Sequence, residues 1–127
     1  MTALLLDTQA FIWWDANDPQ LGGRARAAIQ DATDVYVSSA SAWEIVIKTA
    51  LGKLRTKRRP SNAVAEGGFL ELPITFEHAE AVRELPLHHP DPFDRLIIAT
   101  AVVEGFSIVT SDEKFRLYDV SIIDARR

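Results

Sequence analysis

The chain has 127 residues, a formal net charge of −4 at pH 7 and no cysteine, which excludes disulfides, thiolate catalysis and cysteine-ligated zinc. Hydrophobic residues make up 47% and charged residues 25%, a composition typical of one globular domain, which we expect to span residues 1–127. No apolar stretch approaches the roughly 18 residues that a membrane-spanning helix needs, so we expect no membrane partner and a cytoplasmic location.

Short apolar segments alternate with segments of helical periodicity along the chain. The apolar segments are rich in leucine or β-branched residues, and most are apolar without interruption, as expected of strands covered on both faces. The predicted strands are Ala3–Leu6, Asp34–Ser38, Leu70–Pro73, Ser107–Thr110 and Val120–Ile123. The predicted helices are Thr8–Trp14, Gly22–Asp31, Ser41–Leu51, a short one after Pro60, Phe76–Leu85, Asp91–Glu104 and Asp112–Tyr118.

Strands that alternate with helices imply right-handed crossovers, and hence an α/β fold with a parallel sheet in a three-layer α/β/α sandwich. In such sheets a ligand binds beyond the carboxyl ends of the strands. Asp7 follows the first predicted strand and Asp112 follows the fourth. We therefore expect both carboxylates at the same edge of the sheet.

Four acids stand where an apolar segment meets a helix start, namely Asp7, Glu44, Asp94 and Asp112. Each has an alternative explanation as a helix cap or first-turn acid. Glu44 would complete a capping box with Ser41, and Asp91 would cap the helix that carries Asp94. Taken together, however, several carboxylates in one partly buried pocket repel one another unless a cation neutralises them or some become protonated.

Magnesium or manganese suits such a pocket, because these hard ions take oxygen ligands and also bind substrate phosphate. The chain has only three histidines, which argues against a zinc site; His88 and His89 are interpreted as plain loop residues before Asp91. A metal pair held by carboxylates activates water and stabilises the leaving oxygen of a phosphodiester. The four acids therefore point to a nuclease.

The basic residues are unevenly distributed. Six of the fourteen lie in residues 48–59, where no acid interrupts them, and the other eight are outnumbered by all eighteen acids. We call this stretch the basic segment. It is either a solvated helix end and loop or an edge that contacts phosphate. Its basic residues are Lys48, Lys53, Arg55, Lys57, Arg58 and Arg59.

Three further features are ambiguous. The consecutive apolar residues 11–14 exceed what one helix face buries, so one or two of them are candidates for an exposed contact surface, although core packing is favoured for each. Trp43 is ambiguous in the same way. Arg95 is expected to pair with the carboxylate of Asp94 rather than with a phosphate.

Four ordered blocks of sequence, spread over essentially the whole chain, form one pattern. They are Leu4-Leu5-Leu6-Asp7-Thr8, Ser38-Ser39-Ala40-Ser41-Ala42-Trp43-Glu44-Ile45 with Lys48 and Gly52-Lys53-Leu54, Asp91-Pro92-Phe93-Asp94-Arg95-Leu96-Ile97-Ile98-Ala99-Thr100-Ala101, and Val109-Thr110-Ser111-Asp112. In this pattern the chain resembles the PIN-domain ribonucleases, and among them the VapC-type toxins of prokaryotic toxin-antitoxin pairs.

The resemblance implies a five-stranded parallel sheet in the order 3-2-1-4-5 and metal-dependent cleavage of RNA at a centre that binds Mg²⁺ or Mn²⁺. On matching positions, Asp7 and Asp94 would be the principal metal ligands. Glu44 would be a ligand or orient water, and Asp112 would be the fourth, more variable acid. The supporting polar groups would be Thr8 and Ser111. The resemblance also implies a homodimer and a small antitoxin whose tail enters the acidic groove.

Two other functions share this architecture. A phosphoacceptor receiver domain needs adjacent acids after the first strand and an aspartate after the third, and residues 70–75 offer no aspartate. A catalytically silent PIN-fold interaction module would keep the fold without turnover. The complete set of four acids argues against this second alternative.

Overall fold

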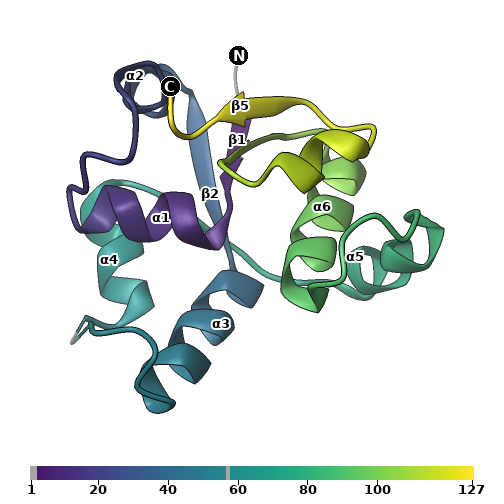
Figure 1. The fold of residues 1–127 in the computed structure, drawn as a ribbon, viewed down its shortest axis with the longest axis horizontal. Helices are drawn as coiled ribbons and strands as arrows, with labels where there is room; N and C mark the ends of the chain where they lie inside the picture. Colours follow the sequence, from purple (N-terminus) through teal and green to yellow (C-terminus); the bar gives the residue numbers. More distant parts are fainter. Residues whose placement is uncertain (1–2, 57) are drawn as a thin grey trace.

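The computed structural model describes residues 3–56 and 58–127. Its centre is a five-stranded parallel sheet in the order β3-β2-β1-β4-β5 (Figure 1). The strand order that the resemblance implies is therefore confirmed. The strands are β1 (Ala3–Leu6), β2 (Asp34–Ser38), β3 (Leu70–Leu72), β4 (Ser107–Thr110) and β5 (Ile122–Asp124).

Helical segments connect the strands, close to where the sequence predicts them. They are α1 (Thr8–Asp15), α2 (Gly23–Asp31), α3 (Ser39–Ala50), α4 (Pro60–Gly67), α5 (Phe76–Ala81), the 3-10 turn η1 (Val82–Glu84), α6 (Pro92–Glu104) and the 3-10 turn η2 (Glu113–Leu117). The predicted helix over residues 76–85 is thus divided between α5 and η1. In the described part of the chain, no helix is long and apolar enough to cross a membrane.

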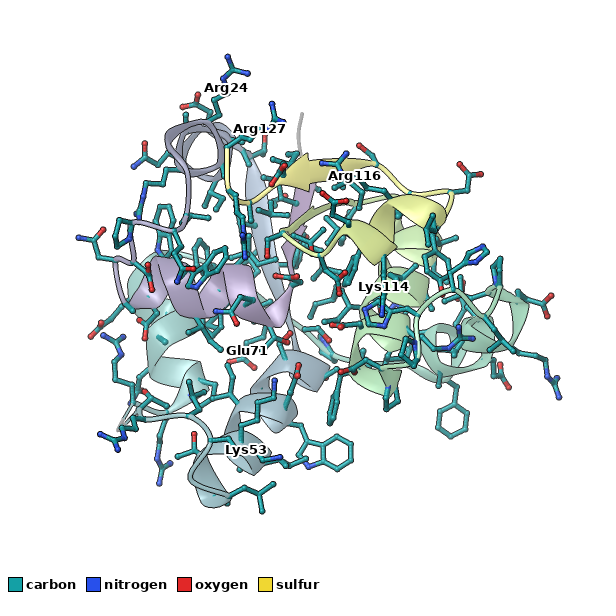
Figure 2. All side chains as sticks on the ribbon, in the orientation of Figure 1. Arg24, Lys53, Glu71, Lys114, Arg116 and Arg127 are labelled. Atoms are coloured by element: carbon teal, nitrogen blue, oxygen red, sulfur yellow. The ribbon has the colours of Figure 1, made fainter. Side chains whose placement is uncertain are left out.

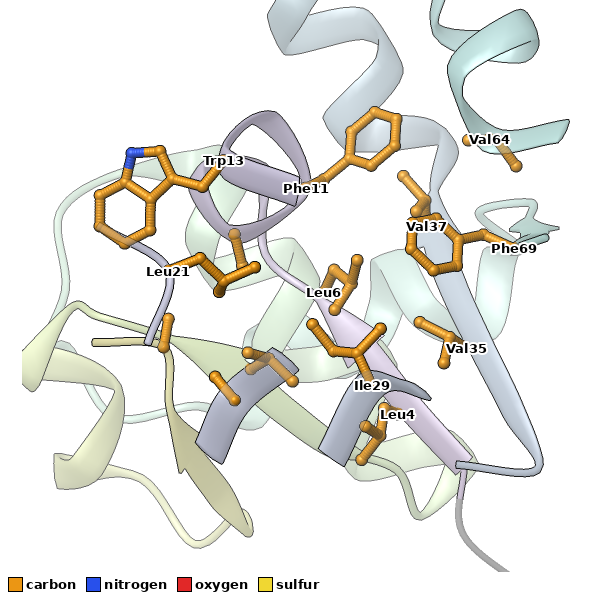
Figure 3. Packing of buried hydrophobic residues seen from close by; sticks show 14 of the residues in the cluster. Leu4, Leu6, Phe11, Trp13, Leu21, Ile29, Val35, Val37, Val64 and Phe69 are labelled. Carbon is orange, nitrogen blue, oxygen red and sulfur yellow. The ribbon is translucent and has the colours of Figure 1, made fainter. Parts of the chain in front are cut away.

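Both faces of the central strands β1 and β4 are buried, as their uninterrupted apolar residues predict. Successive strand residues point to opposite faces, so Leu4 and Leu6 enter one apolar cluster and Leu5 enters the other. Helices α1, α2 and α4 lie on one side of the sheet, and α5 and α6 lie on the other (Figure 1). Figure 3 shows the first cluster, in which leucine and valine side chains of β1 and β2 lie beneath α1.

The four consecutive apolar residues of α1 all pack against the first cluster. Phe11 and Trp13 are buried, while Ile12 and Trp14 are partly buried. The ring of Trp14 lies 5.5 Å from that of Phe69, and the guanidinium of Arg126 lies 5.7 Å from the ring centroid of Trp13. The favoured interpretation, core packing, is therefore confirmed for each of the four, because neighbouring segments cover α1 on more than one side.

Candidate metal centre

Asp7 lies at the carboxyl edge of the sheet, directly after β1. It caps α1, since one carboxylate oxygen accepts a hydrogen bond from the Ala10 amide at 2.8 Å. The other oxygen accepts from the Thr110 hydroxyl at 2.6 Å, across the β1–β4 pair. Burial raises the pKa of Asp7 to about 6, and these two hydrogen bonds limit the increase because they favour the charged form. Asp7 is thus both a helix cap and a member of a buried charged site.

Glu44 lies in α3 and points toward α1. One carboxylate oxygen accepts a hydrogen bond from the Thr8 hydroxyl at 2.6 Å, and the other pairs with the Lys48 ammonium at 2.9 Å. The predicted capping box with Ser41 is wrong, because Ser38 caps α3 and Ser41 already lies inside the helix. The Ser41 hydroxyl instead lies 2.9 Å from that of Thr8. The carboxylate of Glu44 is therefore available to a site between α1 and α3.

Asp94 lies in the first turn of α6. Asp91 caps this helix, as predicted, by accepting hydrogen bonds from the amides of Phe93 at 2.8 Å and Asp94 at 3.2 Å. Burial is the main cause that raises the pKa of Asp94 to about 8, and the nearby negative charges raise it further. Without a cation, Asp94 therefore keeps a proton at neutral pH.

Asp112 follows β4 and caps η2 through the Lys114 amide at 2.9 Å. The negative charges of Asp112 and Glu44 raise the pKa of Asp7. The charges of Asp7, Glu44 and Asp112 in turn contribute to the raised pKa of Asp94. The expected convergence in space is therefore confirmed for acids that come from four separate elements. We call this group the acidic centre; it consists of Asp7, Glu44, Asp94 and Asp112.

His89 also belongs to this site, although the sequence did not predict it there. Its side chain is buried, and Nε2 lies 2.7 Å from a carboxylate oxygen of Asp112 and 3.2 Å from one of Asp94. Nδ1 accepts a hydrogen bond from the Asp91 amide at 3.1 Å. The preceding histidine, His88, is exposed. The interpretation of His89 as a plain loop residue is therefore wrong.

The geometry and chemistry of the site fit a divalent cation. One potential ligand atom each from His89, Asp94 and Asp112 lie within 4.8 Å of one another. Asp7 and Glu44 add further carboxylate oxygens, the ligand type that Mg²⁺ and Mn²⁺ prefer. A cation there would offset the burial and the neighbouring negative charges that together leave a proton on Asp94.

Among the described members of the basic segment, Lys48 is the one that reaches the acidic centre. It lies one helical turn after Glu44, and its hydrogen bond to that carboxylate is the main cause that raises the pKa of the Lys48 ammonium. The side chain is 46% exposed, so the ammonium is open to solvent on one side. Lys48 therefore carries a positive charge to the rim of the site.

The rest of the basic segment lies farther along the chain. Arg58 pairs with Asp15 at 3.4 Å and with Glu66 at 2.5 Å. Lys53, Arg55 and Arg59 are exposed, and among the described residues they form no ion pair. Lys57 lies outside the described residues. Figure 2 shows Lys53 beside the end of α3, at the opposite end of the molecule from Arg24 and Arg127.

Three further expectations have different outcomes. The predicted ion pair between Arg95 and Asp94 is wrong: Arg95 donates instead to the carbonyl oxygen of Pro86 at 2.9 Å. Trp43 is 63% exposed and packs edge-on against Phe93, with ring centroids 5.5 Å apart. Of the two alternatives, its side chain is therefore a surface residue and not part of the core. The hydroxyl that contacts Asp7 belongs to Thr110, whereas the role of Ser111 stays a prediction.

Comparisons with known proteins identify the family of the chain. A protein-family model described as PIN domain matches residues 4–121. The chain is 33% identical over 124 residues to Ribonuclease VapC22 of Mycobacterium tuberculosis, a match that covers 91% of this chain and 92% of that protein.

Solved structures of similar fold include VapBC2 from Rickettsia felis bound to a DNA fragment from its promoter, with 14% identity, a TM-score of 0.71 and coverage of 96% of this chain and 98% of that one. Another is a toxin-antitoxin complex from Klebsiella pneumoniae, with 19% identity, a TM-score of 0.65 and coverage of 96% and 97%. At these identities the two structures establish the fold alone. The match of the PIN domain model and the 33% identity to Ribonuclease VapC22 show that the chain belongs to the PIN domain family, and within it to the VapC group.

Proposed function

We propose that this protein is a metal-dependent endoribonuclease that hydrolyses RNA phosphodiester bonds and acts as the toxin of a toxin-antitoxin pair. The observation that carries the proposal is the acidic centre, in which carboxylates from four elements come together in a partly buried site; burial first, and then the neighbouring negative charges, raise the pKa of Asp94 to about 8. The similarity to a VapC ribonuclease supports the choice of RNA as substrate. The intact set of acids also favours an enzyme over a catalytically silent module.

Mg²⁺ or Mn²⁺ is the proposed cofactor, with Asp7 and Asp94 as principal ligands. Glu44 would be a third ligand or orient water, and Asp112 would bind directly or through water. Such an ion supplies an activated water and charge stabilisation for the leaving oxygen. The protein fixes the orientation of its acids through the hydroxyls of Thr8 and Thr110, which hold Glu44 and Asp7.

The basic segment is proposed to hold the RNA backbone. Lys48 would lie next to the phosphate that is cleaved, because its ammonium is already 2.9 Å from Glu44. The cations that follow α3 in the sequence would contact flanking phosphates, each by charge-assisted hydrogen bonds. These flanking residues are Lys53, Arg55, Lys57, Arg58 and Arg59.

An antitoxin and a second copy of the chain are the proposed protein partners. Toxin-antitoxin complexes among structures of similar fold support the antitoxin. The exposed apolar side chains of Trp43, Val46 and Leu51 at and just after α3 support a contact surface near the site, since such patches mark interaction sites. Relief of toxicity by co-expression of the product of a small neighbouring gene would test the antitoxin, and sedimentation of the purified chain would test the dimer.

The test of the enzymatic proposal is cleavage of a structured RNA by the purified protein with Mg²⁺ or Mn²⁺. Cleavage should stop in excess chelator and in the Asp7→Asn variant. Asp31→Asn is the matched control, because it makes the same chemical change on an exposed acid at the end of α2. Undiminished cleavage by Asp7→Asn protein would refute the assignment.

A further inference from the structure

His89 is held in place from outside the acidic centre. Its backbone amide donates to the Tyr118 hydroxyl at 2.8 Å, and its ring packs edge-on against Phe115, with centroids 5.7 Å apart and an interplanar angle of 84°. Its Nδ1 accepts a hydrogen bond from the Asp91 amide at 3.1 Å. The side chain is only 6% exposed. These contacts fix both the position of the ring and its rotation.

The contacts also place the proton of the imidazole. A ring nitrogen that accepts an amide hydrogen carries no hydrogen of its own, so the hydrogen-bond network assigns the proton of His89 to Nε2. Nε2 is the nitrogen that faces Asp112 at 2.7 Å and Asp94 at 3.2 Å. One N–H therefore points at two carboxylates of the acidic centre.

We propose that His89 is a positioning residue: its Nε2–H holds the carboxylates of Asp112 and Asp94 in the orientation that receives the divalent ion, and His89 itself is not a ligand. The inference rests on the proposed metal-dependent function. By distance alone, His89 could be a metal ligand together with Asp94 and Asp112. Coordination through Nε2, however, would move the ring proton to Nδ1, where it would clash with the N–H of Asp91. We therefore give His89 a role different from that of the acids.

The orienting contact matters most for Asp112. The side chain of Asp112 is 37% exposed, compared with 21% for that of Asp94. An exposed carboxylate samples several rotamers, and fixing it before the ion arrives reduces the entropy lost on binding. Hydrogen bonds from such outer groups typically change metal affinity by about 10- to 100-fold.

The loop that carries His89 is built around Tyr118. The Tyr118 hydroxyl accepts hydrogen bonds from the amides of His88 and His89 and donates to the carbonyl oxygen of Pro86 at 2.9 Å. Arg95 reaches the same hydroxyl at 3.3 Å and the Pro86 carbonyl at 2.9 Å. Arg95, which the sequence suggested as a partner of Asp94, therefore supports the loop that positions His89.

Calorimetric titration of the purified 127-residue chain with Mn²⁺ tests the affinity of the site for metal. We expect His89→Ala to bind Mn²⁺ about 10- to 100-fold more weakly than wild type. His89→Gln should stay within about threefold of wild type, because its amide nitrogen can donate from the place of Nε2. The matched control is His78→Ala, which removes the other buried histidine, far from the acidic centre in its contacts, and should bind Mn²⁺ as wild type does. Wild-type affinity in His89→Ala, or a glutamine variant no better than alanine, would overturn the proposal.

Nitrogen-15 NMR of the wild-type imidazole tests the role without any variant, so a misfolded His89→Ala protein would not leave the question open. We expect Nε2 of His89 to carry the proton both in metal-free protein and at saturating Mg²⁺. Transfer of the proton to Nδ1, or loss of the Nε2 proton when Mg²⁺ binds, would overturn the proposal in favour of a ligand.

These readouts need no RNA, so failure of this inference is distinguishable from failure of the proposed function. Wild-type protein that binds Mn²⁺ and fails to cut RNA contradicts the nuclease alone. A His89→Ala variant that cuts RNA and binds Mn²⁺ as wild type does contradicts the positioning role alone.

Discussion

Two buried histidines in this protein make nearly the same local contacts in different regions. His78, where α5 meets α6, accepts the Thr75 amide on Nδ1 at 3.1 Å and lies 2.7 Å from Glu104 through Nε2. His89 accepts the Asp91 amide at the same distance and lies 2.7 Å from Asp112. The two rings therefore share a proton arrangement, and each presents an N–H to a carboxylate.

The difference lies in what the carboxylate does next. Glu104 is the last residue of α6, so its contact with His78 ties two helices together. Asp112 belongs to the acidic centre, and the same N–H also reaches Asp94 at 3.2 Å. A buried histidine paired with a carboxylate is thus no sign of function by itself. Whether the pair belongs to a functional site depends on the other charged groups around that carboxylate.

The largest expected effect is on RNA cleavage, and it distinguishes Asp94, a carboxylate next to His89, from Glu104, the carboxylate next to His78. Asp94→Asn should reduce RNA cleavage by about 10³-fold, since loss of about 4 kcal/mol of metal-assisted stabilisation corresponds to that factor. The same variant should make the metal-free protein melt about 2–6 °C higher at pH 7.5, because it removes an acid from a crowded site. Cleavage rates and melting curves check both. Glu104→Gln is the control and should cleave at the wild-type rate; an equal loss in both variants would erase the distinction.

The second effect is the reciprocal one, at His78. His78→Ala should lower the free energy of unfolding by about 1–3 kcal/mol, because it removes a buried ring together with its hydrogen bonds to the Thr75 amide and to Glu104. Mn²⁺ affinity should stay at the wild-type value. Denaturant unfolding and calorimetry measure the two quantities. Weakened Mn²⁺ binding in His78→Ala would show that the two histidines are not separable.

The third effect is the pH dependence of stability without metal. The pKa of Asp7 is raised from 3.8 to about 6 and that of Asp94 from 3.8 to about 8, so the folded state binds these protons more tightly than the unfolded state. Their contribution to stability is present below pH 4 and is lost as pH rises toward 8. We therefore expect the melting temperature to fall from pH 5 to pH 8. Added Mg²⁺ should restore it at pH 8, and Asp94→Asn should flatten the dependence. A wild-type melting temperature that rises over this range would contradict the assignment.

The smallest effect concerns Arg55 and Arg59 of the basic segment, which are exposed and form no ion pair among the described residues. Arg55→Ala with Arg59→Ala should raise KM for RNA several-fold and reduce the salt dependence of binding, while kcat changes little, since phosphate contacts position the strand. The control is Arg24→Ala, which removes an exposed cation at the other end of the molecule (Figure 2). A loss of kcat with unchanged KM would place these arginines in the reaction itself.

Features that depend on short-range pattern could be predicted from the sequence. Uninterrupted apolar strands gave parallel pairing, the proline and glycine at the two ends of α6 marked its limits, and acids after β1 and β4 met at one edge. The exact sheet order came from the resemblance, because alternation alone does not specify it.

Features that depend on a choice between equivalent neighbours could not be predicted. Three serines at positions 38, 39 and 41 could each cap α3, and only packing shows that Ser38 does so and frees Glu44. Adjacent His88 and His89 differ only in which ring the loop around Tyr118 turns inward. Likewise, the pleat of β4 decides that Thr110 meets Asp7.

The most direct test of the central claim is the rate of RNA cleavage by the purified protein as Mn²⁺ is added back after chelation. We predict no cleavage in the chelated wild-type protein, full recovery with Mn²⁺, and no recovery in Asp94→Asn at any Mn²⁺ concentration. Wild-type cleavage that persists in chelator, or Asp94→Asn protein that recovers with Mn²⁺ as wild type does, would contradict an acidic centre that acts through a divalent ion.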